Sequence, residues 1–190
     1  MLTQRQVQLL YTTYIELFPG ERERIKLFTD FIDRTATEDL YRRSNFDGHI
    51  TTSAFIINRE RQEILLLRHK TLQRWLQPGG HFEQDASLMA SALREAVEET
   101  HIPAAELVNI PVSNDVMVPF DIDPHHIPVN NKKQEHAHYH HDVRYLFEYT
   151  GEGTNSFNTD EATGLKWVPF TELEQDDTFG KMVDKIRLFI

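Results

Sequence analysis

The chain has 190 residues, a length that suits one domain with an additional terminal segment. It contains no cysteine, which excludes disulfides, thiolate metal sites and mechanisms that need a cysteine nucleophile. Thirty acidic residues against 20 Lys and Arg give a formal net charge of −10, which disfavours long nucleic acids and anionic membranes as partners. Because no apolar run approaches the length of a membrane span and no leader-like segment is present, we expect a cytoplasmic protein.

The first 46 residues (1–46) predict a helical extension that precedes the main domain, residues 47–190. Apolar side chains recur at helical spacing from Val7 to Leu17, and Pro19-Gly20 then breaks the run. Because apolar residues at helical spacing mostly indicate packing, we expect the extension to cover one edge of the sheet, with a dimer arm or a lid as alternatives. Further helical pieces are predicted over 21–34 and 37–43.

Short runs rich in β-branched and aliphatic residues begin after His49 and predict strands. A patterned helix after residue 86 and an amphipathic helix over 179–190 accompany them. Strands with helices on either side predict an α/β sandwich around a mixed sheet. The expected strands lie at 51–58 and 63–69, and two more lie within 106–123. A polar loop over 125–138 is expected to precede a half-buried strand at 138–150, and a last strand is expected at 164–170.

The helix predicted to begin near Ser87 carries three carboxylates close together. Glu95, Glu98 and Glu99 share one strip, because their spacing places them three and four positions apart. Hard cations such as Mg²⁺ bind carboxylate oxygens, and Arg94 can hold a neighbouring carboxylate in place. A solvated acidic face with an ion pair is the alternative. The other half of the helix is apolar and is expected in the core: Leu88, Met89, Ala92, Leu93, Ala96 and Val97.

A glycine pair precedes this helix, in Pro78-Gly79-Gly80. Paired glycines permit close backbone approach, and such a loop can present a carbonyl to a metal ion. From residue 80 to 102 the sequence resembles the Nudix box, a pattern of glycine, arginine and glutamate at fixed spacing. The matching residues are Gly80, Arg94, Glu95, Glu98, Glu99 and Ile102.

Two positions depart from the box. Ala86 replaces a glutamate that usually braces the loop against the helix, and we expect Glu83 or Asp85 to substitute for it. His101 replaces the glycine after the helix, where histidine tolerates the left-handed conformation better than bulkier residues do. Both departures leave the three carboxylates in place.

The resemblance implies a Nudix-type α/β/α sandwich with an N-terminal helical extension, and a pyrophosphohydrolase activity. Such an enzyme splits the diphosphate linkage of a small nucleotide derivative by attack of water on phosphorus. The substrate would be a nucleoside triphosphate or a nucleoside diphosphate linked to another group, such as ADP-ribose. The resemblance also suggests a homodimer.

The resemblance further implies Mg²⁺, for which Mn²⁺ can substitute. The expected ligands are Glu95, Glu98, Glu99 and the backbone carbonyl of Gly79, and Glu98 is ligand or base depending on the number of ions. Glu161 lies where relatives place a further ligand or a general base, although a solvated loop acid is the alternative. Arg94 is expected to support the catalytic carboxylates.

Other residues are candidates for contacts with substrate. Arg144 is expected to meet a phosphate or to form an ion pair with Asp142, and Trp75 to pack in the core rather than stack on a base. His136, His138 and His140 alternate along a strand and could bind Zn²⁺, contact phosphate or ribose, or simply be exposed. The wider cluster comprises His125, His126, His136, His138, His140 and His141.

Three other functions compete with hydrolysis of a small nucleotide. A non-catalytic Nudix module that senses a nucleotide or binds a partner remains an alternative, although such modules typically lose box carboxylates. An isopentenyl diphosphate isomerase is disfavoured because that enzyme depends on a cysteine. Decapping of RNA is disfavoured by the acidic charge balance.

Overall fold

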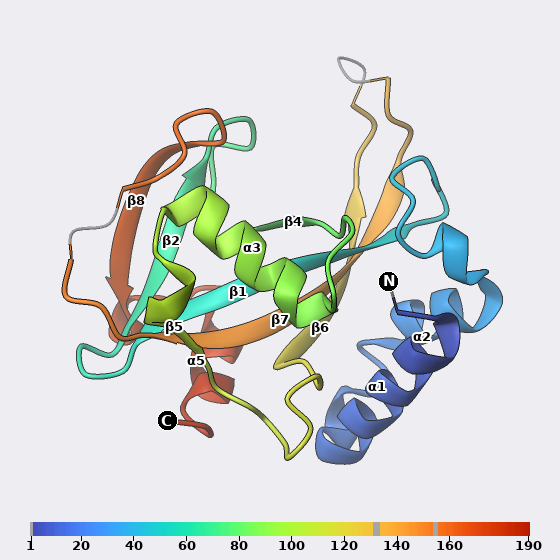
Figure 1. The fold of residues 1–190 in the computed structure, drawn as a ribbon, viewed down its shortest axis with the longest axis horizontal. Coiled ribbons are helices and arrows are strands. Elements are labelled where there is room, and N and C mark those ends of the chain that lie inside the picture. Colours follow the sequence, from blue (N-terminus) through green and yellow to red (C-terminus); the bar gives the residue numbers. More distant parts are fainter. Residues whose placement is uncertain (1, 131–133, 154–155) are drawn as a thin grey trace.

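A computed structural model describes residues 2–130, 134–153 and 156–190. Within them, an eight-stranded mixed sheet lies between two layers of helices. Figure 1 shows α3 (Leu88–Thr100) in front of the sheet and α5 (Gly180–Ile186) behind it. This arrangement confirms the predicted α/β sandwich. None of the described helices is long and apolar enough to cross a membrane.

Two long strands, β1 (His49–Asn58) and β7 (His138–Tyr149), run parallel at the centre of the sheet, and every other strand pair is antiparallel. The main order is β3-β2-β1-β7-β5, while β4 also pairs with β1, β6 with β7 and β8 with β2. The remaining strands are β2 (Glu63–His69), β3 (Trp75–Leu76), β4 (Gly79–His81), β5 (Leu107–Asn109), β6 (Asp121–Ile127) and β8 (Ala162–Pro169).

Successive side chains of β1 point to opposite faces of the sheet and so contribute to two separate cores. Ala54 and Ile56 belong to the core that contains α3, whereas Phe55 and Ile57 belong to the core that contains α5. The first core also includes α1 (Gln4–Leu17) and α2 (Lys26–Arg34), so the N-terminal extension widens the helical layer on the α3 face. The short helix α4 (Phe170–Leu173) belongs to the second core.

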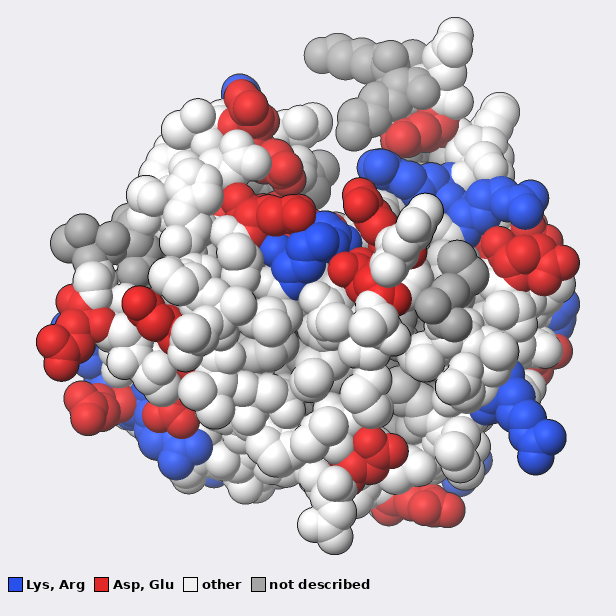
Figure 2. Space-filling view, in the orientation of Figure 1, with Lys and Arg blue, Asp and Glu red and all other residues white. Residues whose placement is uncertain are grey.

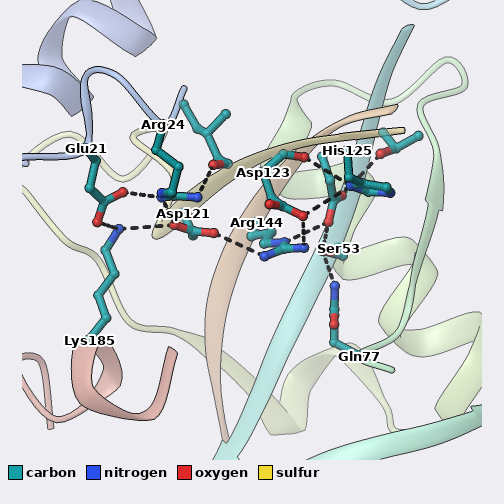
Figure 3. Close-up of polar contacts among 12 residues, drawn as sticks. Glu21, Arg24, Ser53, Gln77, Asp121, Asp123, His125, Arg144 and Lys185 are labelled. Carbon is teal, nitrogen blue, oxygen red and sulfur yellow. Dashed lines mark hydrogen bonds and ion pairs between the residues drawn. The ribbon is translucent and has the colours of Figure 1, made fainter. Parts of the chain in front are cut away.

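A buried charge network joins the N-terminal extension to the sheet and to α5 (Figure 3). Asp121, at the start of β6, accepts a hydrogen bond from Arg24 at 2.6 Å and pairs with Lys185 at 3.3 Å. Lys185 also donates to Glu21 at 2.7 Å and to the Tyr14 hydroxyl at 2.8 Å. Removing one partner of a buried ion pair is strongly destabilising, so this network makes the extension an integral part of the folded chain.

The first predicted helix of the extension is present as α1, and the two later pieces are shorter than predicted. The helix predicted over 21–34 begins only at Lys26, after a 3₁₀ turn at Pro19–Glu21 (η1). The piece predicted over 37–43 forms a single 3₁₀ turn at Thr37–Asp39 (η2). In the stretch before Lys26, Arg24 pairs with Asp121 and Glu21 pairs with Lys185, and tertiary contacts of this kind override local helix propensity.

Two predictions around β6 and β7 are wrong. The loop predicted from residue 125 starts later, because His125–Ile127 continue β6 and pair with His138–His140. Pro124 lies within β6, and an edge strand tolerates proline because one of its sides forms no ladder hydrogen bonds. β7 is buried or partly buried on both faces rather than half-buried. Val143, Tyr145 and Phe147 pack in the core that contains α3, and Leu146 packs in the core that contains α5. Residues 131–133 of the predicted loop lie outside the described residues.

Candidate active site

The carboxylates of α3 face the interior more than its pattern predicted. Ser87 caps the helix by accepting a hydrogen bond from the Ala90 N–H at 3.1 Å. Glu95 and Glu99 are each only 8% exposed, whereas the predicted core residues Met89, Leu93 and Val97 are only partly buried. The buried face is rotated toward the acids, because they lie against β4, where the two glycines leave room for them.

Close contacts on both sides of β4 require the two glycines. A Cβ on Gly80 would lie 2.6 Å from the carboxylate of Glu95, and the Gly79 N–H donates to Glu99 Oε2 at 3.1 Å. On the other side of β4, a Cβ on Gly79 would lie 2.4 Å from the Ser53 side chain. Any larger residue at either position would therefore displace the sheet or the acids.

Arg94 connects the loop before α3 to the carboxylates on the helix. Its guanidinium donates to Asp85 at 3.0 and 3.2 Å, to Glu95 at 2.9 Å and to Glu98 at 3.0 Å. It also donates to the backbone carbonyl of His81 at 3.0 Å. Asp85 thus braces the loop in the place that Ala86 leaves open, and Arg94 orients two of the three carboxylates.

The end of α3 takes the left-handed conformation that its sequence predicted. His101 has φ 54° and ψ 17°, and its N–H donates to the carbonyl of Val97. Its ring lies 2.8 Å from the Ser156 hydroxyl. A histidine therefore ends the helix where the box pattern has glycine.

Glu161 lies beside the helix acids. Its loop is joined to the end of α3, because the Asn158 N–H donates to the Glu99 carbonyl at 2.9 Å. The Glu161 carboxylate contacts that of Glu99 and accepts from the Asn158 amide at 3.4 Å. The structure therefore brings Glu161 together with Glu95, Glu98 and Glu99, although it is distant from them in sequence.

The electrostatics of this cluster are unfavourable for four ionised carboxylates. Burial, followed by contact with Glu161, raises the pKa of Glu99 to about 8. Burial also raises the pKa of Glu95 to about 7, with Glu98 and Glu161 adding to the shift and Arg94 opposing it. Figure 2 shows acidic and basic side chains gathered above α3, at a notch in the upper edge of the surface. Two buried carboxylates, Glu95 and Glu99, beside the exposed carboxylates of Glu98 and Glu161, with Arg94 as the arginine that pairs with the helix acids, match the oxygen-rich sites that bind Mg²⁺.

Arg144 is enclosed by acids of the protein itself (Figure 3). Its guanidinium donates to Asp142 at 2.9 Å, to Asp121 at 3.2 Å and to Asp123 at 2.6 Å. Its side chain is 11% exposed and lies above the ring of Phe55. The ion pair with Asp142 is therefore present, and contact with a substrate phosphate stays a prediction.

The structure divides the predicted histidine cluster among several places. His138 and His140 lie together with His49, which the sequence analysis did not single out, and His49 lies 3.1 Å from His81 between Nε2 atoms. His136 is exposed against Phe46 instead. No local sequence signal marks His49 or His81, because pairing between distant strands brings them to this place: β1 with β7 for His49, and β4 with β1 for His81. Of the other members, His125 pairs with Asp123, His126 is exposed against Tyr139 and His141 stacks on Phe31.

Trp75 is half-buried against the core behind the sheet. The Lys166 ammonium lies 4.4 Å from the centre of its ring, and the ring also covers Gly164. These contacts favour the packing role that we expected over stacking on a base.

Comparison with known proteins agrees with this site. The sequence profile of the NUDIX domain matches residues 48–186, which include every carboxylate of the cluster. The chain belongs to the Nudix family. A probable DHNTP pyrophosphohydrolase of Lactococcus lactis subsp. cremoris (strain MG1363) is 29% identical to this Nudix chain over 110 residues. That alignment covers 58% of this chain and 60% of the relative.

Solved structures share the Nudix fold of this chain at low sequence identity. A NUDIX-family hydrolase from Clostridium perfringens has 21% identity and a TM-score of 0.56, over 75% of this chain and 98% of that one. An Ap4A hydrolase from C. elegans, in a binary complex, has 17% identity and a TM-score of 0.55, over 74% and 96%. The E. coli dihydroneopterin triphosphate pyrophosphohydrolase has 15% identity and a TM-score of 0.51, over 74% and 94%. At these identities the likeness concerns the fold alone.

Proposed function

We propose that this Nudix protein is a metal-dependent pyrophosphohydrolase that splits the diphosphate linkage of a small nucleotide derivative with water. The observation that supports this proposal is the group of four carboxylates around the glycine pair, with raised pKa values at Glu95 and Glu99. Perturbed pKa values of this kind concentrate at functional sites. All three box carboxylates are retained, which argues against a module without activity.

The donor set fits Mg²⁺, with Mn²⁺ as a substitute. Glu95, Glu98, Glu99 and the carbonyl of Gly79 would hold the ion, since hard cations bind carboxylate and backbone oxygens. When bound, such an ion neutralises the diphosphate and lowers the pKa of a coordinated water.

The remaining steps belong to side chains of the protein. Arg94 holds Glu95 and Glu98 in fixed positions and ties them to the carbonyl of His81. Glu98 and Glu161 are both exposed, so either can accept the proton of the attacking water and return it to solvent. Positioning and electrostatics supply most of the acceleration in phosphoryl transfer, which is why a fixed cluster of acids matters more here than a single nucleophile.

A panel of substrates with Mg²⁺ tests this function. It should include nucleoside triphosphates, ADP-ribose and NADH. Dinucleoside polyphosphates and dihydroneopterin triphosphate are added because similar proteins are named as an Ap4A hydrolase and as a probable DHNTP pyrophosphohydrolase. Products are separated by chromatography, and cleavage within the diphosphate of at least one compound is expected. Absence of turnover with both Mg²⁺ and Mn²⁺ would favour the alternative of a nucleotide-sensing module.

Glu161→Gln separates the loop acid from the helix acids. If Glu161 is the general base, its loss should lower the maximal rate by about 10²- to 10⁴-fold at every metal concentration. If it binds an ion, added metal should rescue the rate. Turnover is measured against metal concentration, with Glu172→Gln, an exposed acid of α4, as control. A rate equal to that of the control would show that Glu161 is a solvated loop acid, and Glu98 would then be the candidate base.

A further inference from the structure

A second group of potential ligands lies on the sheet, and it consists of histidines alone. His49 begins β1 and is paired directly with His140 of β7, while His138 lies two residues earlier on the same face of β7. One ligand atom from each of these three rings lies within 4.8 Å of the others. His49 and His138 are almost fully buried, at 1% and 5% exposure. Three imidazoles from two strands are thus gathered in one place on the sheet.

Backbone contacts fix the tautomers of two of these rings. The Nδ1 atom of His138 lies 2.7 Å from the carbonyl of His136, and Nδ1 of His49 lies 3.4 Å from the carbonyl of Asn45. Because a carbonyl oxygen can only accept, each Nδ1 carries the proton and each Nε2 presents a lone pair. Histidines that bind metals are oriented in the same way, by donating the other ring N–H to a carbonyl or carboxylate.

His81 supplies a fourth imidazole. Its Nε2 lies 3.1 Å from Nε2 of His49, and its ring centre lies 5.2 Å from that of His140. Ligand atoms of a tetrahedral zinc site with Zn–N bonds of about 2.0–2.1 Å are separated by roughly 3.3 Å. Since Nε2 of His49 presents a lone pair, Nε2–H of His81 donates a hydrogen bond to it, and a shared ion would replace that proton at nearly the same separation of the two rings.

His49 and His140 lie in surroundings that disfavour the charged ring. Burial lowers the pKa of His49 to about 4. Burial, followed by the nearby rings of His49, His81, His125 and His138, lowers the pKa of His140 to about 2.

The histidine group and the carboxylates lie on opposite faces of the short strand β4. The Cβ position of Gly80 faces Glu95, and His81, the next residue, points to the other face. The two groups also differ in chemistry, since carboxylate oxygens suit Mg²⁺ and imidazole nitrogens suit Zn²⁺. We propose that His49, His138 and His140, with His81 as fourth ligand, form a zinc site separate from the carboxylate site.

Such an ion would join three parts of the chain. It would connect the start of β1 and the start of β7 to β4, whose His81 carbonyl accepts the hydrogen bond from Arg94. The site would therefore hold the glycine strand against the sheet and steady the loop that carries the box residues. This role is structural and does not depend on the proposed hydrolysis.

Zinc binding is measured by equilibrium dialysis of chelator-treated protein against Zn²⁺ with excess Mg²⁺, followed by metal analysis. We expect one Zn²⁺ per chain and a higher melting temperature with Zn²⁺. His140→Gln and, as a second variant, His81→Gln should weaken binding by more than about 100-fold. His126→Gln, an exposed histidine of β6, should bind as the wild type does.

The double variant Glu95→Gln/Glu99→Gln distinguishes the two sites. It should retain Zn²⁺ if the histidines bind the ion. Loss of Zn²⁺ from this double variant, combined with full retention by His140→Gln and His81→Gln, would place the ion on the carboxylates and overturn the proposal. Failure of the wild type to retain Zn²⁺ would overturn it as well. Circular dichroism of the histidine variants checks that they fold.

Discussion

Removal of divalent cations should abolish hydrolysis, because the carboxylates of Glu95, Glu98 and Glu99 alone would repel a diphosphate. The protein is treated with EDTA, the chelator is removed, and turnover of the substrate found in the panel is followed as Mg²⁺ or Mn²⁺ is returned. Turnover should fall to background and recover with either ion, since the ion supplies charge stabilisation worth several kcal/mol. Persistent turnover in chelator would remove the proposed mechanism.

Chelation would also strip the proposed zinc site, and the order of metal addition separates the two effects. Mg²⁺ alone should restore turnover if the histidine site only steadies β4. If full turnover requires Zn²⁺ in addition to Mg²⁺, the histidine site contributes to the geometry of the box. His140→Gln serves as the comparison, because it should behave in Mg²⁺ alone as the chelated wild type does.

The features of the site that could be predicted from sequence are those that depend on local geometry. The strip of Glu95, Glu98 and Glu99 follows from helical spacing, and the left-handed end of the helix at His101 follows from the box pattern. The need for glycine at Gly80 could also be expected, because only a residue without a Cβ permits close approach. Each of these features is decided within a few residues of the chain.

Features that depend on long-range packing could not be predicted. The burial of Glu95 and Glu99 results from the approach of β4 to the helix, which the helical pattern of α3 does not contain. His49 meets His140 only because β1 and β7 are parallel neighbours. Arg144 is surrounded by acids because β6 brings Asp121 and Asp123 beside it, and the sequence predicts a loop for the end of β6.

Glu99→Gln should reduce turnover by about 10²- to 10³-fold while the fold is retained. The change removes one ligand charge from a preorganised electrostatic site and keeps the shape of the side chain, including an oxygen that can accept from the Gly79 N–H. The rate is measured at saturating substrate and Mg²⁺. The control is Glu60→Gln, an exposed acid in the turn after β1. A rate near that of the control would show that Glu99 is not part of the machinery.

The same variant should be more stable than the wild type when metal is absent and the pH is high. Burial raises the pKa of Glu99 from its usual 4.5 to about 8, so the folded protein binds a proton more tightly than the unfolded chain does. This stabilisation is complete below pH 4.5 and is lost as the pH rises to about 8, because the ionised form is disfavoured in the fold. Glutamine does not ionise, so the variant does not lose this stability.

Urea unfolding in EDTA should therefore show the variant to be more stable than the wild type at pH 8.5 and about equally stable at pH 4.5. With Mg²⁺ at pH 8.5 the wild type should be the more stable protein, because the ion binds its folded state. A variant that is less stable than the wild type at pH 8.5 in EDTA would show that burial and the neighbouring acids do not destabilise the ionised carboxylate of Glu99.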